Sequence, residues 1–167
     1  MAKHFIIINP FDSLFKVSDK VSELTKRRIL SNPEYCGKAL SSFVLASGAR
    51  EIIDFLSRSN SFKAVLVSAY PAEITQMVAY HFGLKHLKVY EKTSMYHVSY
   101  AQAMEELGMS EEDTALLTGH QCEVDDALSM NITPIFFSDS NRCYKRGCHN
   151  AHNITDVLIG LGLKVNR

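Results

Sequence analysis

Four short apolar runs rich in β-branched residues most constrain how this chain can fold. They occupy residues 4–8, 64–68, 114–118 and 133–137, and each ends in a polar loop. Runs of this length and composition are typical of strands that are buried on both faces of a parallel sheet. Parallel strands require crossover connections, and the segments between these runs are long enough to hold helices. The sequence therefore predicts an α/β fold.

Helical periodicity fills the intervals between these runs. One segment opens with Pro71 at the first turn, carries Glu73 near the positive end of the helix and stops at Gly83. Alternating strands and helices predict a three-layer sandwich with a central parallel sheet, in which ligands bind at the carboxyl ends of the strands. The predicted helices cover residues 18–30, 48–57, 71–84 and 96–108.

Residues 31–47 interrupt this regular alternation. The segment is too short for a second domain, and we interpret it as a small helical cap insert over the carboxyl edge of the sheet. A chain of 167 residues with 46% hydrophobic and 22% charged residues fits one domain of ordinary size. We therefore expect residues 1–167 to form a single domain.

Composition also limits the classes of partner. Lys plus Arg and Asp plus Glu both number 18, so no global field favours a nucleic acid or an anionic membrane surface. No stretch approaches the roughly 18 apolar residues of a membrane span, and the N-terminal apolar run is too short for a signal peptide. We predict a cytoplasmic protein with neither a nucleic acid nor a membrane partner. The four cysteines are interpreted as thiols or metal ligands.

The order of these elements resembles that of the haloacid dehalogenase-like (HAD) phosphatase superfamily over nearly the whole chain. The resemblance is best in residues 64–132. There the family's second strand, its Ser or Thr and the next helix are similar to KAVLVSAYPAEITQMVAYHFGL. The later helix, acidic turn, fourth strand and acidic loop resemble AQAMEELGMSEEDTALLTGHQCEVDDALSMNITPIFF. The helix before the second strand resembles GAREIIDFLS, and the terminal short strand and helix resemble NITDVLIGLGL. The resemblance implies a HAD-like Rossmannoid sandwich.

In that family the first strand ends in Asp-x-Asp-x-Thr/Val, where the first Asp attacks phosphorus and the second is the general acid and base. Here the strand runs into NPFDS, so Asn9, Phe11 and Ser13 occupy the three motif positions. An amide cannot form the acyl-phosphate, and a phenyl ring cannot transfer a proton. Asp12 is one residue out of register and is expected to point elsewhere. The resemblance therefore implies a degenerate first motif that has lost standard phosphoryl transfer.

The second and third motifs are also weakened. Ser68 occupies the second-motif position, where its hydroxyl would donate to a phosphoryl oxygen, although a Ser at a strand end often caps a turn instead. The third-motif lysine would fall near Ser94. Lys92, two residues earlier, is the candidate for that role, and an exposed lysine is the alternative interpretation.

The fourth motif normally supplies acidic magnesium ligands after Gly-Asp. Here Gly119 is followed by His120, and the nearest carboxylates that we consider downstream are Asp125 and Asp126. Magnesium requires hard oxygen ligands, so the resemblance implies a magnesium site that is weak or lost. We expect no cofactor to be required.

The loop that follows the last predicted strand contains a second group of candidate residues. Soft thiolate and imidazole donors suit zinc, although their spacing here matches no standard finger. The alternative is a polar loop with one or two buried cysteines. The candidate zinc ligands are Cys143, Cys148, His149 and His152.

The same loop carries Arg142, Lys145 and Arg146, a local positive cluster. With Ser68 and the backbone N–H groups at helix starts, these cations could bind a phosphate or carboxylate group without catalysing a reaction on it. Solvated surface charge is the alternative interpretation.

Three functional hypotheses follow. The favoured one is a HAD-like pseudoenzyme that binds a small phosphorylated or anionic ligand, or a protein partner, at the former active-site edge. The second is a working hydrolase of phosphate esters in which His120, Asp12 and a downstream Asp form a new site. The third is a transition-metal module. Because the favoured hypothesis gives position 9 no chemistry, we expect Asn9→Ala to leave folding nearly unchanged.

Overall fold

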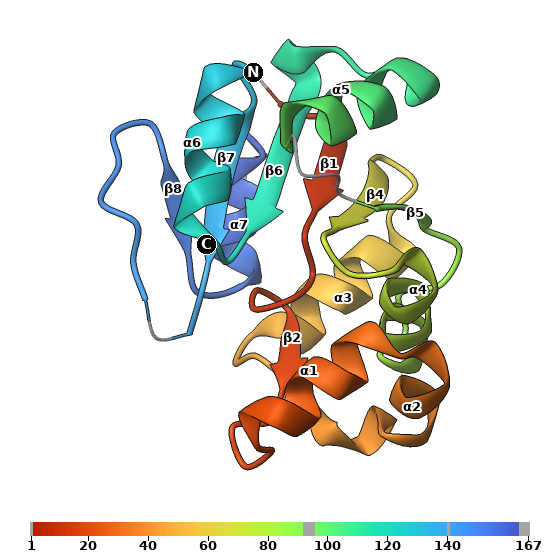
Figure 1. Ribbon diagram of the computed structural model, residues 1–167. Helices are drawn as coiled ribbons and strands as arrows, with labels where there is room; N and C mark the ends of the chain where they lie inside the picture. Colours follow the sequence, from red (N-terminus) through yellow and green to blue (C-terminus); the bar gives the residue numbers. More distant parts are fainter. Residues whose placement is uncertain (1, 92–95, 140, 164–167) are drawn as a thin grey trace.

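A six-stranded parallel sheet forms the centre of the computed structural model, which describes residues 2–91, 96–139 and 141–163 (Figure 1). The strand order is β5-β4-β1-β6-β7-β8, and every neighbouring pair is parallel. This arrangement confirms the α/β fold predicted from the buried apolar runs. The strands are Phe5–Ile8 (β1), Lys63–Ser68 (β4), Lys88–Glu91 (β5), Thr114–Thr118 (β6), Thr133–Phe137 (β7) and His149–Ala151 (β8).

Helices cover both faces of this sheet and produce the predicted three layers. Successive side chains of β1 point to opposite faces, so Ile6 and Ile8 join one hydrophobic cluster and Ile7 joins another. The first cluster includes side chains of α3, α4 and α7, and the second includes those of α5 and α6. The helices are Ala49–Arg58 (α3), Ala72–His81 (α4), Tyr96–Leu107 (α5), Gln121–Ser129 (α6) and Ile154–Gly160 (α7), with a short turn at Glu111–Asp113 (η2).

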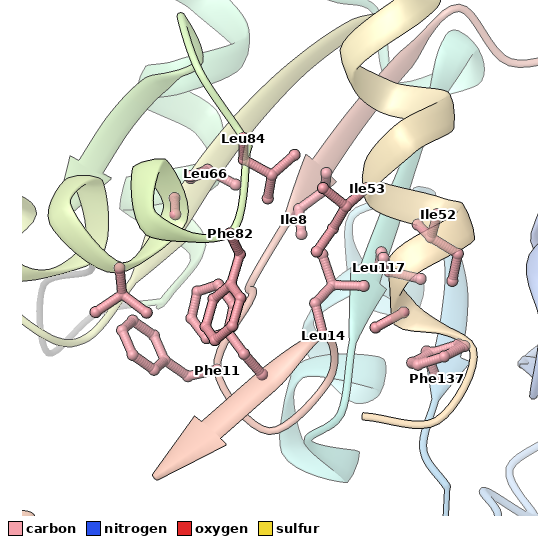
Figure 2. Packing of buried hydrophobic residues seen from close by; sticks show 14 of the residues in the cluster. Ile8, Phe11, Leu14, Ile52, Ile53, Leu66, Phe82, Leu84, Leu117 and Phe137 are labelled. Atoms are coloured by element: carbon pink, nitrogen blue, oxygen red, sulfur yellow. The ribbon is translucent and has the colours of Figure 1, made fainter. Parts of the chain in front are cut away.

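The larger cluster fixes the carboxyl ends of the central strands. Figure 2 shows Ile52 and Ile53 of α3 pointing toward Leu117 of β6 and toward Leu14, which follows β1. Each of these four side chains is at most 1% exposed. Burial of an aliphatic side chain of this size stabilises the fold by about 1.5–3 kcal/mol. The loop after β1 is therefore anchored by the core on which it rests.

A small antiparallel sheet lies beyond the carboxyl end of β1. It pairs β2 (Phe15–Val17) with β3 (Phe43–Leu45), and Figure 1 shows α1 and α2 beside it. We call residues 15–45 the cap. Between its two strands the cap contains α1 (Glu23–Ser31), α2 (Pro33–Lys38) and a short turn, η1 (Leu40–Ser42).

The cap begins earlier than the insert predicted at residues 31–47. That prediction captured only α2, η1 and β3, because the pairing of β3 with a strand at residue 15 leaves no local sequence signal. The helix predicted from residue 18 starts instead at Glu23, where the Ser22 hydroxyl accepts a hydrogen bond from the Thr25 N–H at 3.3 Å. Leu24 of this helix is 80% exposed.

Two strands of the main sheet escaped prediction. β5 and β8 are three or four residues long and carry polar side chains, so neither forms an apolar run. The family resemblance placed a terminal strand and helix in NITDVLIGLGL, but in the described part of that segment the structure has only α7, and the strand β8 precedes it.

None of the described helices could cross a membrane. The longest of them, α5, has 12 residues, which corresponds to about 18 Å. Within the described ranges, no helix combines the length and the apolar character that a membrane span requires.

Candidate functional site

The loops after β1, β4 and β6 meet at one edge of the sheet around a small cavity. Its volume is about 120 Å³, enough for roughly four water molecules at about 30 Å³ each. Common ligand pockets are larger, at roughly 300–1,000 Å³. The cavity is lined by Asn9, Phe11, Ser68, Ala69, Tyr70, His120, Cys122 and Glu123.

Asn9, which the family resemblance aligns with the nucleophile, is 6% exposed and uses both polar atoms of its amide in hydrogen bonds. Its Nδ2 donates to Oε1 of Glu123 at 2.6 Å. Its Oδ1 accepts from the backbone N–H of Phe11 at 3.3 Å. The side chain therefore joins the end of β1 to α6 and to its own loop.

Glu123 lies at the centre of a buried polar cluster that the sequence did not reveal. The side chain is on the inner face of α6 and is 1% exposed. Besides the Asn9 amide, its Oε1 accepts from the Thr118 hydroxyl at 2.8 Å, and its Oε2 accepts from the Tyr100 hydroxyl. Burial, together with the Glu123 carboxyl group, raises the pKa of Tyr100 far above its usual value, so this phenol stays protonated.

Phe11, which the family resemblance aligns with the general acid and base, belongs to an aromatic cluster. Its ring lies 5.0 Å from Phe15 and 4.8 Å from Tyr70, both edge to face, and 6.4 Å from Phe43. The side chain is 3% exposed. Edge-to-face pairs of this kind add about 0.5–1.5 kcal/mol beyond area burial. Position 11 therefore fastens the cap to the end of β1.

Ser13 and Asp12 close the turn between β1 and β2. The Ser13 hydroxyl, which is fully buried, donates to the backbone carbonyl of Asn9 at 2.6 Å. Asp12 adopts φ = 67°, and its N–H donates to the Phe15 carbonyl at 2.8 Å. An Asp tolerates this left-handed conformation better than most residues.

Gly119 explains how the start of α6 approaches this turn so closely. A Cβ atom added at position 119 would lie 2.5 Å from the Asp12 carbonyl oxygen and 3.0 Å from the Ser13 nitrogen. Both contacts involve backbone, which cannot move aside cheaply. The glycine is therefore needed for its lack of a side chain.

His120 and Asp12 form the outward-facing part of the site. Nε2 of His120 lies 3.3 Å from Oδ2 of Asp12, and the side chains are 36% and 50% exposed. The backbone N–H of His120 also donates to the Thr118 hydroxyl oxygen at 3.0 Å, and this hydrogen bond fixes the start of α6. The Asp12 carboxylate therefore faces the imidazole of His120 and does not line the cavity beside Asn9.

Ser68 serves the turn after β4. Its oxygen accepts from the Tyr70 N–H at 3.1 Å, and the residue is 1% exposed. The adjoining Tyr70 is held protonated, because burial and the nearby Asp12 raise its pKa. Ser68 lines the small cavity but caps a turn, as the alternative interpretation of the sequence anticipated.

The residues present do not fit a magnesium ion. Asp125 pairs with Lys145, and neither Asp125 nor Asp126 lines the cavity beside Asn9. Glu123 does line it, but both of its oxygens accept hydrogen bonds from the protein. Asn9 turns its side-chain oxygen toward the backbone of Phe11. Among the described residues, this edge of the sheet therefore gathers no set of available carboxylate oxygens of the kind that magnesium takes from a protein.

The proposed zinc ligands are not assembled into a site. Nε2 of His149 lies 2.7 Å from the Asp156 carbonyl oxygen, and Nδ1 of His152 lies 3.1 Å from that of Ser138. Cys143 is buried and Cys148 is half-buried. In the part of the chain that the structure describes, no group of three or more His, Cys, Asp or Glu side chains could hold a metal ion.

The predicted cationic ligand group is dispersed. Lys145 contacts Asp125 and the Gln121 carbonyl on α6, while Arg142 and Arg146 are exposed. Among the described residues that line the cavity beside Asn9, none is Arg or Lys. The remaining candidate, Lys92, lies outside the described residues.

A larger cleft separates α1 of the cap from the loop after β4. Its volume is about 720 Å³, and Tyr70, Pro71, Val17 and Leu30 supply apolar surface. Its cations are Lys16, Lys26 and Arg27, and its carboxylates are Asp12, Asp19 and Glu23.

The cationic side chains of this cleft differ in whether a nearby carboxylate neutralises their charge. Lys16 and Lys26 both lie within ion-pair distance of Asp19, at 3.2 and 3.7 Å. The Lys16 pKa is raised mainly by its hydrogen bond to Asp19. Arg27 makes no ion pair with the described residues. It is therefore the cation in the cleft with capacity for an anion.

Sequence reasoning missed Glu123 and Tyr100. A signal for Glu123 existed, because it lies four residues before Ala127 and therefore on the same, buried face of the helix. An acid among apolar residues on such a face indicates a buried hydrogen-bonding role. Tyr100 gave no comparable signal, because its partner is 23 residues away in the chain.

No protein-family model matches the sequence, and no curated protein matches it at a significant level. Solved structures do resemble this fold. One is a HAD-superfamily hydrolase from Ehrlichia chaffeensis (TM-score 0.68, 16% identity, 97% of this chain and 98% of that chain). Another is a phosphoglycolate phosphatase, so described, from Lactobacillus plantarum (TM-score 0.69, 10% identity, 96% and 100%). A third is a dehalogenase with an intermediate complex (TM-score 0.71, 12% identity, 99% and 99%). The chain therefore has a HAD-like fold.

Proposed function

We propose that this protein is a HAD-like protein that lacks standard phosphatase chemistry and binds a small anionic ligand beside the former catalytic loop. The contact between Asn9 and Glu123 is the observation that supports this proposal. At the nucleophile position an amide donates to a buried carboxyl group and accepts from the backbone of Phe11. A side chain held in this way, and lacking an ionisable oxygen, does not attack phosphorus.

Position 11 of the same loop offers no side chain that could act as a general acid or base. Phe11 carries no titratable group, and its ring fills the space beside Phe15 and Tyr70 where a second acid would need room. The adjoining cavity, at about 120 Å³, also presents the Glu123 carboxyl group to anything that enters it. A phosphate group would meet that carboxyl group there and no described Arg or Lys.

The cleft between α1 and the loop after β4 is the better place for an anion. Its volume of about 720 Å³ lies within the range of small-molecule sites, and Tyr70 and Leu30 offer apolar contacts. Arg27 supplies a planar group of donors that matches a carboxylate or phosphate. The ligand therefore occupies the cap side of the loop and leaves the small cavity empty.

A second candidate function rests on the pair formed by His120 and Asp12. A carboxylate 3.3 Å from an imidazole nitrogen can orient the ring and stabilise its protonated form. His120 also lines the small cavity, so it could act on a molecule placed there. This candidate is a hydrolase with altered residues, and its activity would depend on His120 and not on Asn9.

Turnover measurements separate these two candidates. The purified chain, incubated with p-nitrophenyl phosphate and a panel of phosphate monoesters with and without Mg²⁺, is expected to release no phosphate above background. Robust magnesium-dependent release by the native chain would overturn the proposal. Release that disappears in His120→Asn but persists in Asn9→Ala would establish the second candidate.

Binding of an anion is tested with inorganic phosphate as the probe. In an NMR titration we expect amide shifts within residues 16–31 and at residues 69 and 70, because these segments supply most of the cleft lining. Arg27→Gln should remove these shifts, whereas Arg142→Gln, a matched change on the exposed loop after β7, should leave them intact. The reverse result would move the anion site to that loop, and no shifts in any variant would contradict anion binding.

A further inference from the structure

The two cysteines of the loop after β7 share one hydrophobic cluster. Cys143 is 2% exposed and packs with Val124 of α6 and Phe136 of β7, and the half-buried Cys148 packs against the same cluster. Burial and the neighbouring Cys143 together raise the pKa of the Cys148 thiol. Cys36, the other buried cysteine, belongs to the cap side of the molecule and to a different cluster.

Separate hydrogen bonds hold the backbone of each cysteine in place. The Asn150 side chain on β8 accepts from the Cys143 N–H at 2.9 Å and donates to the Cys143 carbonyl at 2.8 Å. The Cys148 N–H donates to the Lys145 carbonyl at 3.2 Å, and Gly147 takes φ = 90°. The chain therefore turns back on itself between the two thiols, and their proximity is a product of this turn.

We propose that Cys143 and Cys148 are a modification site at which a reversible disulfide forms. Their side chains pack in the same small cluster and belong to one short loop, so a local adjustment would bring the sulfur atoms to the S–S bond length of about 2 Å. The left-handed Gly147 lies inside the loop that the bond would close, where a glycine adjusts at little cost. This inference is independent of any ligand or activity at the former catalytic loop.

The oxidant is a small disulfide such as that of glutathione. The Cys148 thiolate attacks one sulfur of that disulfide, forms a mixed disulfide and releases one small thiol. Cys143, after loss of its proton, attacks the Cys148 sulfur and releases the second small thiol. Two S–H bonds are broken and one S–S bond forms, and two electrons and two protons pass to the oxidant. Cys148 reacts first because it is the more exposed of the two.

The two histidines that follow this cysteine pair are not placed to act with it as metal ligands. His149 and His152 each have a ring nitrogen in contact with a backbone carbonyl, and the described residues offer no third ligand beside the two thiols. A pair of close thiols without further ligands is suited to disulfide formation and not to holding zinc, which takes four ligands. Oxidation would pin the loop that carries Lys145, whose amine pairs with Asp125 of α6.

The experiment equilibrates the full reduced chain in mixtures of glutathione and glutathione disulfide, followed by acid quenching, alkylation and peptide mass spectrometry. We expect a cross-link between the peptides of Cys143 and Cys148 in the oxidising mixtures and its reversal in the reducing ones. Burial raises the pKa of Cys148 to about 12, so the rate should rise about tenfold per pH unit between pH 7 and pH 9. The exposed Cys122 should form only a mixed disulfide, which serves as an internal control.

Two variants sharpen the result. In Cys143→Ser the mixed disulfide at Cys148 should accumulate, because the resolving thiol is missing, whereas Cys36→Ser should behave like the native chain. The native chain provides the decisive readout, so the test does not depend on the stability of either variant. The proposal fails if both thiols remain open to alkylation in the most oxidising mixture, or if the cross-link joins either of them to Cys122.

Discussion

Nδ2 of Asn9 and Oε1 of Glu123 lie 2.6 Å apart, at the junction between the first strand of the sheet and helix α6. Both side chains are nearly excluded from solvent. The Glu123 carboxyl group also accepts hydrogen bonds from the hydroxyl groups of Thr118 and Tyr100. A buried carboxyl group is tolerated only when its oxygens are satisfied in this way. Position 9 is therefore a structural partner of Glu123.

Exchanging the amide and the acid tests this partnership. Asn9→Asp would set two carboxyl groups against each other, and we expect a loss of about 2–3 kcal/mol in the free energy of unfolding. Glu123→Gln should cost about 1 kcal/mol, because an amide oxygen can still accept from Tyr100. In the double variant the new amide at position 123 can donate to the new carboxyl group at position 9, so the two losses should not add. Urea denaturation of the four proteins gives the coupling energy, and strict additivity would contradict the assigned contact.

Placing an acid at position 11 should disrupt the fold. Phe11→Asp would place a carboxyl group among Phe15, Tyr70 and Phe43, and we expect it to cost about 4 kcal/mol or to prevent folding. Phe11→Leu keeps an apolar side chain and should cost only about 1–2 kcal/mol. Thermal unfolding followed by circular dichroism separates the two. A stable Phe11→Asp variant would mean that the aromatic cluster does not hold the cap.

Gly119 offers a steric test of the same junction. In Gly119→Ala the new methyl group would meet the Asp12 carbonyl at 2.5 Å, and we expect a loss of about 2–3 kcal/mol. Gly108 is the control, because it has φ = 65° but nothing within 4 Å of an added Cβ. Gly108→Ala should therefore cost only the conformational strain, about 1 kcal/mol. Equal losses in urea denaturation would show that the loop adjusts to the methyl group.

The thiol of Cys148 predicts a loss of stability in alkali under reducing conditions. Burial and the contact with Cys143 raise its pKa to about 12, compared with about 8.5 in an unfolded chain. The folded state therefore favours the neutral thiol. The stability that this confers is complete below about pH 8.5 and is lost progressively as pH rises toward 12.

The measurement is urea denaturation at pH 8 and pH 10 in the presence of a reductant. We expect the Cys148 contribution to fall by about 1 kcal/mol over this interval, about half of the full linkage value, because solvent screens a half-buried group. Cys148→Ser should show a correspondingly smaller decrease, while Cys122→Ser should match the native chain. The same decrease in all three proteins would mean that Cys148 is not the group responsible.

The central strands of the sheet were predictable because each one carries a strong local signal. β6 (TALLT) and β7 (TPIFF) coincide with the predicted runs, since strands buried on both faces need apolar residues at nearly every position. The edge strands β5 and β8 meet no such requirement and were missed. The cap strand β2 was missed for another reason: α1 and α2 separate it from its partner β3 along the chain.

The candidate site was only partly predictable. The family resemblance directed attention to Asn9 and Phe11, but it did not indicate the contacts that these two side chains make. Asn9→Ala, expected from the sequence to be nearly neutral, would leave the Glu123 carboxyl group without one of its donors, so we now expect it to destabilise the fold. The two residues of this contact are 114 positions apart, and such a contact leaves no mark in a local pattern.

The rings that join the cap to the sheet also determine how this molecule can admit a guest. Phe15 stacks on Phe82 at 5.4 Å and touches Phe43 edge to face at 6.4 Å, so one aromatic column runs from the end of α4 through β2 into β3. A movement of the cap away from the sheet would break these ring contacts and expose the ring surfaces to solvent. If the proposed anion binds in the cleft beside α1, the rings therefore favour a rigid, preformed site over one that opens by a hinge motion of the cap.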